Sequence, residues 1–544
     1  MSERLSSPWA WLETPPPHLK AYDGEGVWDE RTIFQQAAGL AEQDPDFVAL
    51  IDGDISVTRQ QAVLEAEALS SALYARGLRA GDVIAFQLPN WREAMVINLA
   101  AALSGLIVNP IVPIYRDHEV SSMLADCRAR AFFVAGEFRN YDYADMAARV
   151  QARLPDLRHI FTVRGDGAND FAALVEEGRS RRFARPKVDP LGVKMVLYTS
   201  GTTGLPKGVL HSHVAISHIL KKSAAYWGME AGEATLMPSP VTHISGYASG
   251  LEAPFVCGTR TILMESWAAR SAVDLIEKHN VVGTVAATPF LVELAAAARE
   301  SGKALPSLRF FACGGAAVPP DLIPAANAAF ANLRAFRVFG ASEVPLVTFG
   351  WPRDERLAAS TDGAIVDYAV RVVGDDGREV PDGREGEILA RGPGMMLGYA
   401  DAEQTREAIT PDGYFRTGDL GTRTSDGALI ITGRKKDLII RGGENISAKE
   451  IEDALHLHPQ VQEAAVVAMP HARLGEGICA FVIPAGGEAP PADDLAAHIA
   501  AYGLAKQKIP ERFEFRGQFP RTASGKVRKD LLRAEVQQII KSAN

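Results

Sequence analysis

Cysteine is scarce in this chain, and the few cysteines form no recognisable motif. Cys127, Cys257, Cys313 and Cys479 are the only four in 544 residues, and no two of them stand in a CxxC arrangement. This spacing excludes a dense disulfide framework and a cysteine-based zinc site, because both need closely spaced or paired cysteines. We therefore expect reduced thiols, as in a cytoplasmic protein.

The sequence also lacks an excess of positive charge. It carries 57 Lys and Arg against 67 Asp and Glu, which gives a formal net charge of −10. A nucleic-acid-binding protein would need a basic face to neutralise phosphates, so no nucleic-acid partner is expected. A local basic pocket for a phosphorylated ligand remains compatible with this balance.

Long hydrophobic runs are absent as well. The apolar stretch at residues 94–103 is interrupted by Asn98 and preceded by Asn90 and Arg92. Because a membrane span needs about 20 apolar residues, this stretch predicts a buried helix followed by a strand, and no membrane span. The N-terminal sequence MSERLSSPWAWLETPPP contains no continuous apolar core followed by a cleavage site. No secretory signal is expected, and the predicted location is the cytoplasm.

What the chain does contain is an alternation of helix and strand patterns. A length of 544 residues predicts two or more domains. Helices are expected at 91–105 and 117–127, between buried strands at 83–88 and 131–135, which is the βαβ arrangement of a parallel sheet. A second set follows, with strands at 234–237, 260–264, 282–286 and 308–312 and helices near 245–256, 268–279 and 290–302. The predicted class is α/β, with a large N-terminal domain of two parallel-type αβ subdomains.

From residue 363 to 433 the pattern changes to short β-rich runs. They are separated by turns such as Asp-Asp-Gly at 375–377 and Ser-Asp-Gly at 425–427, which predict a small antiparallel, β-barrel-like subdomain. Beyond Arg434, helices are expected at 447–456, at 492–502 and from 528, with strands near 461–469 and 478–484. We place the domain boundary at 434–437. This gives an N-terminal domain, 1–434, and a small α+β C-terminal domain, 435–544.

The segment 198–208, YTSGTTGLPKG, gathers hydroxyls, glycines and one lysine directly after an apolar run. Glycines let backbone N–H groups approach a polyanion, hydroxyls add donors, and Lys207 adds a positive charge. A solvated turn or linker is the alternative, but linkers seldom follow a buried strand so closely. The loop therefore predicts a phosphate site, although it is not the GxxxxGK[ST] loop of kinases and GTPases. Its candidate contacts are Thr199, Ser200, Gly201, Thr202, Thr203, Gly204 and Lys207.

Four further motifs follow this loop along the chain. They are FGASE at 339–343, YFRTGDL at 414–420, ITGRKKDLIIRGGENI at 431–446 and PRTASGK at 520–526. Together with the loop they closely resemble the ordered motif set of the AMP-forming acyl-CoA synthetases, whose superfamily includes peptide-synthetase adenylation domains and firefly-type luciferases. The resemblance covers about residues 30–535. It implies that the C-terminal domain is mobile.

The resemblance also implies a site for ATP and Mg²⁺. Glu343 would bind Mg²⁺ through its carboxylate, Phe339 would stack on adenine, and Ser342 would lie beside phosphate or metal. The family usually has Tyr where this chain has Phe339 and Thr where it has Ser342. This chain therefore loses one phenol hydroxyl but should keep the stacking on adenine. Asp419 and Arg434 would contact the ribose, with a mutual surface salt bridge as the alternative. Gly314, Gly315, Ala316, Gly340 and Ala341 would complete the nucleotide site.

Resemblance alone assigns roles to two lysines and two glycines. Lys526 would bind both the substrate carboxylate and the α-phosphate, because a mobile cation offsets the repulsion between two anions. Lys436 would be the hinge about which the C-terminal domain turns between half-reactions. Gly442 and Gly443 would line the tunnel for the pantetheine arm of CoA, so a bulky side chain there would block thioester formation and spare adenylation.

An acid pocket is expected around His243, which resembles the family's gate between the acyl pocket and the CoA tunnel; ordinary packing is the alternative for a lone histidine. The other expected pocket residues are apolar or small: Ile244, Gly246, Tyr247, Cys313 and Val344. Amino-acid-activating members of the superfamily carry an Asp in the segment that matches 241–246 to hold the amino group, and this chain has none there. We therefore expect an uncharged medium-chain, alicyclic or aromatic acid. His211/His213 and His456/His458 have no third ligand nearby, so no zinc site is assigned.

The implied enzyme is an ATP-dependent acid–CoA ligase with Mg²⁺ as cofactor and ATP and CoA as cosubstrates. It would form acyl-AMP and pyrophosphate, and then the acyl-CoA thioester and AMP. Three alternatives remain: an adenylation enzyme that loads a carrier protein, a luciferase-like oxygenase, and an inactive nucleotide-binding sensor. The retained Lys526, Glu343 and Asp419 argue against the sensor. The sequence does not determine the oligomeric state, and a homodimer is compatible with it.

Overall fold

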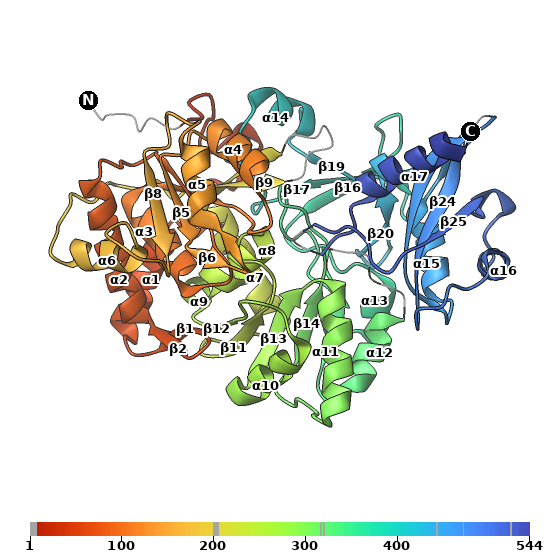
Figure 1. Ribbon diagram of the computed structural model, residues 1–544, viewed down its shortest axis with the longest axis horizontal. Coiled ribbons are helices and arrows are strands. Elements are labelled where there is room, and N and C mark those ends of the chain that lie inside the picture. Colours follow the sequence, from red (N-terminus) through yellow and green to blue (C-terminus); the bar gives the residue numbers. More distant parts are fainter. Residues whose placement is uncertain are drawn as a thin grey trace.

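The structure is a computed structural model that describes residues 8–24, 26–199, 206–315, 318, 321–441, 444–471, 473–522 and 525–543. Figure 1 shows a large N-terminal part, coloured red to green, beside a smaller C-terminal part in blue. The described strands form two seven-stranded sheets, one sheet of four strands, one of five and the short pair β6 (Glu137–Phe138) and β7 (Tyr141–Asp142). The α/β class predicted from the sequence is confirmed. Across these residues, no helix combines the length and apolar character needed to cross a membrane.

The first seven-stranded sheet has the order β15-β14-β13-β11-β12-β1-β2. Its strands are β1 (Val48–Asp52), β2 (Ile55–Thr58), β11 (Ala234–Met237), β12 (Arg260–Leu263), β13 (Val281–Ala286), β14 (Phe310–Cys313) and β15 (Arg334–Arg337). All neighbours are parallel except β1 and β2. The connecting helices include α10 (Ala269–His279), α11 (Thr288–Ser301) and α12 (Leu322–Ala329). The β1–β2 hairpin comes from far earlier in the chain, so the two αβ subdomains interlock.

The second seven-stranded sheet has the order β18-β10-β9-β4-β3-β5-β8. Its strands are β3 (Val83–Gln87), β4 (Ile107–Pro110), β5 (Ala131–Ala135), β8 (His159–Val163), β9 (Val193–Thr199), β10 (Lys207–Ser212) and β18 (Gly398–Tyr399). Around it lie η1 (Pro17–Tyr22), α1 (Ile33–Gln43), α2 (Arg59–Ala75), α3 (Arg92–Ser104), α4 (Asp117–Asp126), α5 (Tyr143–Gln151), α6 (Phe171–Arg179) and α7 (His213–Trp227). The apolar stretch at 94–103 is the buried helix expected, and β4 follows it. The segment 198–208, called the phosphate-loop segment below, runs from β9 into β10. Because these two strands are antiparallel neighbours, the segment joins two strands and not a strand and a helix.

A third sheet contains β16 (Ala369–Val373), β17 (Gly386–Arg391), β19 (Phe415–Arg423) and β20 (Leu429–Arg434), all antiparallel. Helices α13 (Glu355–Ser360) and α14 (Ala402–Ala408) lie in the adjoining segments. The antiparallel sheet expected from the turn pattern is present. It is open, however, and not the barrel-like structure predicted, because four strands are too few to close around a core.

After the turn η3 (Lys435–Asp437) come the strands of the fourth sheet, β21 (Ile439–Arg441), β22 (Glu444–Ile446), β23 (Val461–His471), β24 (Gly475–Pro484) and β25 (Arg512–Phe515), which belong to the predicted C-terminal domain. Its helices are α15 (Ala448–His456), α16 (Ala492–Ala501), η4 (Lys506–Lys508) and α17 (Lys529–Ala543). Successive residues of β23 face opposite sides: Ala464 and Val466 pack with α15 and α16, whereas Ala465 and Val467 pack with α17. This period of two follows from strand geometry. The exact domain boundary stays a prediction.

The helix expected near 245–256 is not one regular helix. It consists of α8 (Ile244–Gly246), the π-helical turn η2 (Tyr247–Glu252) and α9 (Ala253–Val256). Pro254 stands at the start of α9 and has no N–H to continue an α-helical ladder. The side chain of Glu252 is fully buried beside that of Lys194 in β9. The expected single helix is therefore corrected to three short helical pieces, the last of which starts next to Pro254.

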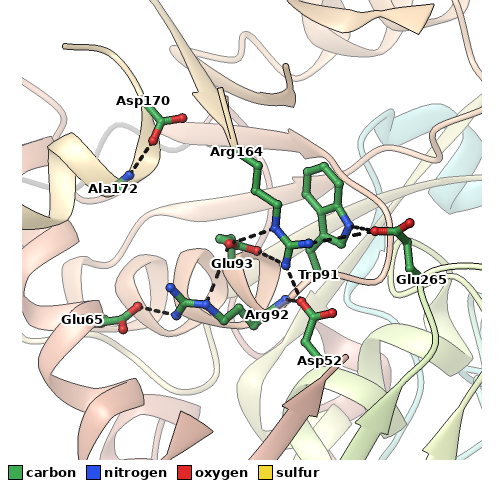
Figure 2. A network of polar contacts seen from close by, with 9 residues as sticks. All are labelled: Asp52, Glu65, Trp91, Arg92, Glu93, Arg164, Asp170, Ala172 and Glu265. Atoms are coloured by element: carbon green, nitrogen blue, oxygen red, sulfur yellow. Dashed lines mark hydrogen bonds and ion pairs between the residues drawn. The ribbon is translucent and has the colours of Figure 1, made fainter. Parts of the chain in front are cut away.

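Arg164 connects the two large sheets (Figure 2). It follows β8, has a φ of +57° and places its guanidinium 4.3 Å above the Trp91 ring. It donates to both carboxylate oxygens of Glu93, at 3.2 and 3.1 Å, and to Asp52 at the end of β1. Because Asp52 belongs to the first sheet and Arg164 follows a strand of the second, this ion cluster fixes one subdomain against the other.

Candidate active site

Three parallel strands end at the same edge of the first sheet, where they carry residues expected in the site. Gly314 and Gly315 follow β14, Phe339 follows β15, and His243 follows β11. Gly315 has a φ of +80°, and a Cβ on Gly314 would lie 2.8 Å from Val338 O, so both positions favour glycine. Ligands of open α/β sheets bind at this carboxyl edge.

The FGASE segment forms a tight loop at this edge. Phe339 N donates to Thr348 Oγ1 (2.7 Å), and Ala341 and Val344 exchange two backbone hydrogen bonds of 3.0 and 3.1 Å. Gly340 lies within the turn that these bonds close. The loop is therefore held by its own backbone and presents Glu343 in one orientation.

Tyr399 connects Glu343 with the end of the phosphate-loop segment. Its hydroxyl donates to Glu343 Oε1 (2.6 Å), and Lys207 Nζ lies 5.1 Å from the centre of its ring. Burial, and then the negative charge of Glu343, raise the pKa of Tyr399, so the phenol keeps its proton and acts as a donor. Tyr399 was not predicted from the sequence, because no motif surrounds it; β18 brings it beside β10.

His211 of β10 holds the FGASE loop through one hydrogen bond. Its Nε2 lies 2.7 Å from Ser342 O, and because a carbonyl can only accept, Nε2 carries the hydrogen. Desolvation lowers the pKa of this fully buried imidazole to about 4, so it is neutral at pH 7. Within the described part of the chain its Nδ1 has no hydrogen-bond partner. From the sequence, His211 was weighed only as a zinc ligand, and this supporting contact was not predicted.

The His211→Gln variant is expected to be less sensitive to acid than the wild type. The folded His211 titrates at a pKa of about 4 and the unfolded one near 6.5. The unfolded state thus binds the proton first, and the free energy of unfolding falls as the pH drops from 6.5 to 4, by about 3 kcal/mol for this one group. Glutamine keeps a donor for Ser342 O without a titrating ring. Urea unfolding at pH 7 and pH 4.5 would measure the difference.

The exposed His118→Gln variant is the control for this measurement, since it removes a histidine that is accessible in the folded chain. It should follow the wild-type pH dependence. If His211→Gln followed it as well, the assignment of a buried neutral imidazole would be wrong.

Asp419 and Arg434 face each other across β19 and β20. Arg434 Nε donates to Asp419 Oδ1 (2.6 Å), and the Asp419 side chain is buried while that of Arg434 is 44% exposed. The mutual ion pair that the sequence analysis weighed is thus present. The ribose contact of these two residues stays a prediction, and the charges of both groups also act on Lys526.

Lys526 is presented by a hairpin of the C-terminal domain. Thr522 N donates to Lys526 O (2.7 Å), and Lys526 N donates to Thr522 Oγ1 (3.1 Å). Arg521 donates to Gly525 O (2.9 Å) and forms an ion pair with Glu463 on β23. The base of the hairpin is therefore fixed to the C-terminal sheet.

The Lys526 side chain reaches the N-terminal domain. A Cβ on Gly315 would lie 3.8 Å from Lys526 Cε. Desolvation, followed by the positive charge of Arg434, lowers the pKa of Lys526, whereas Asp419 and Glu343 raise it. Lys526 is nevertheless an exposed residue, so solvent also reaches its side chain. One lysine of the smaller domain thus meets the expected nucleotide residues of the larger one.

The expected acid-pocket residues are mostly inaccessible in this structure. His243 is half-buried, its Nδ1 lies 3.3 Å from Ser245 Oγ, and desolvation followed by Lys526 lowers its pKa to about 4. Ile244 and Gly246 are buried, and Tyr247, Cys313 and Val344 have no exposed surface. The Tyr247 hydroxyl donates to Asn98 in the protein interior. Among these residues His243 alone lies open to a ligand, next to Lys526.

Several expected contacts fall where no structure is described. Ser200, Gly201, Thr202, Thr203, Gly204, Ala316, Gly442 and Gly443 lie outside the described residues. Thr199 and Lys207 stand on either side of the undescribed part of the phosphate loop. They are opposite each other in the pairing of β9 with β10. The two ends of the segment are therefore adjacent, beside Tyr399 and Glu343.

Comparison with known protein families agrees with this geometry. A family model described as "AMP-binding enzyme" matches residues 34–400, and one described as "AMP-binding enzyme C-terminal domain" matches residues 450–526. The chain belongs to the AMP-binding enzyme family. The resemblance inferred from the motifs is confirmed, and so is the class of AMP-forming acid–thiol ligase. ATP is accordingly a substrate of this AMP-binding enzyme.

Individual relatives are similar to this AMP-binding enzyme over nearly its whole length. The medium-chain fatty-acid–CoA ligase of Escherichia coli (strain K12) is 34% identical over 531 residues, covering 95% of this chain and 92% of that protein. The 2-hydroxy-7-methoxy-5-methyl-1-naphthoate–CoA ligase of Streptomyces carzinostaticus is 31% identical and covers 97% of each. The crystal structure of ATP-bound MatB from Rhodopseudomonas palustris has a TM-score of 0.84 at 26% identity, covering 94% of this chain and 100% of that one.

Proposed function

We propose that this AMP-binding enzyme joins an uncharged medium-chain, alicyclic or aromatic carboxylic acid to coenzyme A. The observation that carries the proposal is the position of Lys526, which stands beside Gly315 and within electrostatic reach of Glu343, Asp419 and Arg434. A cation from the small domain is thereby brought to the place where two anions would have to meet.

In the first step a carboxylate oxygen of the acid attacks the α-phosphorus of ATP. A new bond forms between that oxygen and phosphorus, the bond to the bridging oxygen breaks, and pyrophosphate leaves with the electron pair. Lys526 would neutralise the approaching carboxylate and the α-phosphate together, and Lys207 would hold the departing phosphates. Lys207 lies in β10 and Lys526 in the C-terminal part of the chain. Lys526 would therefore act on the carboxylate and the α-phosphate, and Lys207 on the departing phosphates.

Magnesium fits this site as an ion carried by the nucleotide. Glu343 supplies a carboxylate, whose Oε1 accepts from Tyr399. Among the described residues, no three His, Cys, Asp or Glu side chains are grouped so that they could hold a metal ion by themselves. Mg²⁺ commonly uses one or two carboxylates together with substrate phosphates, and Glu343 meets that demand. Bound there, the ion would offset the negative charge of the phosphates.

In the second step the C-terminal domain would turn about Lys436, withdrawing Lys526 from the site. The thiol sulfur attacks the acyl carbon, the bond to AMP breaks, and the thiol proton is released. Arg533 of α17 donates to Asp437 Oδ1 (3.0 Å) and contacts Lys436 O (3.5 Å), so the pivot is attached to the domain that moves. Because its pKa is about 4, His243 would be an uncharged gate between acid and thiol.

The nature of the acid is inferred from the side chains around His243. The residues expected to line the acid pocket, Ile244, Cys313 and Val344, are themselves uncharged and so offer no partner for an ammonium or a second carboxylate. The two similar ligases named above act, by name, on a medium-chain fatty acid and on a naphthoate. Both observations support an uncharged acid of middling bulk.

A panel of carboxylic acids tests the proposal. Pyrophosphate release with ATP and Mg²⁺ would report adenylation of medium-chain, alicyclic, aromatic and amino acids, and mass spectrometry would identify the thioester formed with CoA or with a holo-carrier protein. We expect turnover of an uncharged acid and a CoA thioester. Activity on amino acids alone, or product with the carrier alone, would refute the proposal.

The Tyr399→Phe variant should slow adenylation about tenfold, because Glu343 loses a hydrogen bond of the kind that contributes about 1.5–3 kcal/mol with a charged partner. Tyr399 is a positioning residue, so kcat should fall while KM for the acid stays the same. Tyr226→Phe is the matched control, since it removes a hydroxyl bonded to Gly350 O (3.2 Å). Equal rates in the two variants would exclude a positioning role for Tyr399.

A further inference from the structure

A cavity of about 860 Å³ lies at the opposite edge of the first sheet from the active site. Ala234, Arg260, Phe310 and Arg334 line it, and each is the first residue of its strand, in β11, β12, β14 and β15. The cavity therefore marks the amino edge of the parallel strands. Its volume is that of a site for a small molecule.

Arginine dominates the charge of this cavity. Four arginines line it, against one acidic residue, Glu233, in a chain whose net charge is −10. Arg309 is committed to Glu233 through contacts of 2.7 and 2.8 Å. Arg334 is 3.8 Å from Glu355 and about half exposed, and Arg353 is exposed. Arg334 Nη1 also donates to Leu333 O (3.0 Å), so the other guanidinium nitrogens of Arg334 and the guanidinium of the exposed Arg353 are the groups available to a ligand.

A neutral nitrogen and a flat wall accompany these cations. His279 Nε2 is buried and has no hydrogen-bond partner among the residues described. Trp227 is held in place by its Nε1, which donates to Phe349 O (2.8 Å), and by the Phe310 ring, whose centre is 5.5 Å away. The cavity therefore offers a rigid aromatic face beside its positive charge.

We propose that this cavity binds a phosphorylated ligand of up to nucleotide size, at a site separate from the one that uses ATP. Guanidinium groups pair with phosphate oxygens in a two-pronged geometry, and several of them around one cavity match a polyanion better than a single carboxylate. The aromatic face would accept a planar ring if the ligand carries one. This site goes beyond the ligase activity and does not depend on it.

The two sites are separated by the length of the strands. Phe310 begins β14 at the cavity, and Cys313 ends it just before Gly314. A strand of four residues spans about 13 Å, so the side chains that line the cavity at one edge of the sheet do not contact those of the active site at the other edge. Substitutions at the cavity can therefore be made without touching the catalytic residues.

Calorimetric titration of the full-length enzyme with pyrophosphate and with ADP tests the proposal. Three variants assign the binding: Arg334→Ala/Arg353→Ala at the cavity, Lys207→Ala at the ATP site, and Arg356→Ala as the control, an exposed arginine near the cavity that does not line it. We expect a binding class that survives in Lys207→Ala and is at least about tenfold weaker in the cavity variant. The control should match the wild type.

Pyrophosphate and ADP distinguish the two sources of phosphate. Equal affinity for both indicates recognition of the phosphates alone, and tighter binding of ADP indicates that the Trp227 wall contacts the base; either result supports the proposal. If no binding class depends on Arg334 and Arg353, or if Arg356→Ala loses as much affinity as the cavity variant, the proposal is overturned.

Discussion

Replacing Lys526 by alanine is expected to reduce adenylation by roughly 10²–10³-fold, the usual effect of removing one group aimed at developing charge. Lys526 is the group that approaches Gly315 from the C-terminal domain, close to the carboxylates of Glu343 and Asp419. Without it, the acid and the α-phosphate would meet with their repulsion uncompensated. The ATP–pyrophosphate exchange rate measures this half-reaction alone.

The second half-reaction separates a catalytic role from a general loss of structure. When acyl-AMP is supplied, Lys526→Ala should form the thioester at nearly the wild-type rate, because the lysine is withdrawn in that step. Lys506→Ala is the matched control, an exposed lysine of the same domain in η4. Equal losses in both half-reactions would contradict the division of roles between adenylation and thioester formation.

Much of the candidate site could be predicted because its residues lie in short motifs at strand ends. Glu343 and Asp419 are recognisable from their neighbours, and the structure brings both near Lys526. Tyr399 and His211 could not be found in this way. Each acts through a single contact, with Glu343 and with Ser342 O, and those contacts exist only after β18, β10 and the FGASE loop have been packed together.

The fold shows the same division between local and distant information. Strands β5 and β11 have the bounds expected, since a short apolar run between polar turns is a local signal. The pairing of β1 with β12 joins Leu50 to Thr261, and no periodicity reports a partner so far along the chain. The π-helical turn at 247–252 was also beyond reach, because its irregularity accompanies a buried ion pair whose members come from different elements.

That buried pair predicts the largest effect on stability. Lys194→Met is expected to lower the free energy of unfolding by about 3–5 kcal/mol, because it leaves the carboxylate of Glu252 buried without its cation. The two side chains are 2% and 0% exposed, and Glu252 Oε1 accepts from both Lys194 and Asn98 (3.1 Å). Urea unfolding at pH 7 measures the loss. A methionine fills a similar volume, so the change reports the missing charge more than a cavity.

The double variant Lys194→Met/Glu252→Gln decides whether charge or packing is responsible. Glutamine keeps an oxygen for Asn98 and removes the unpaired charge, so the double variant should recover most of the stability lost in Lys194→Met. A double variant as unstable as the single one would assign the loss to packing. Because Glu252 ends the π-helical turn that begins at Tyr247, four residues after His243, the single variant should also raise KM for the acid. Recovery of that KM in the double variant would show that the ion pair holds the acid-binding segment in place.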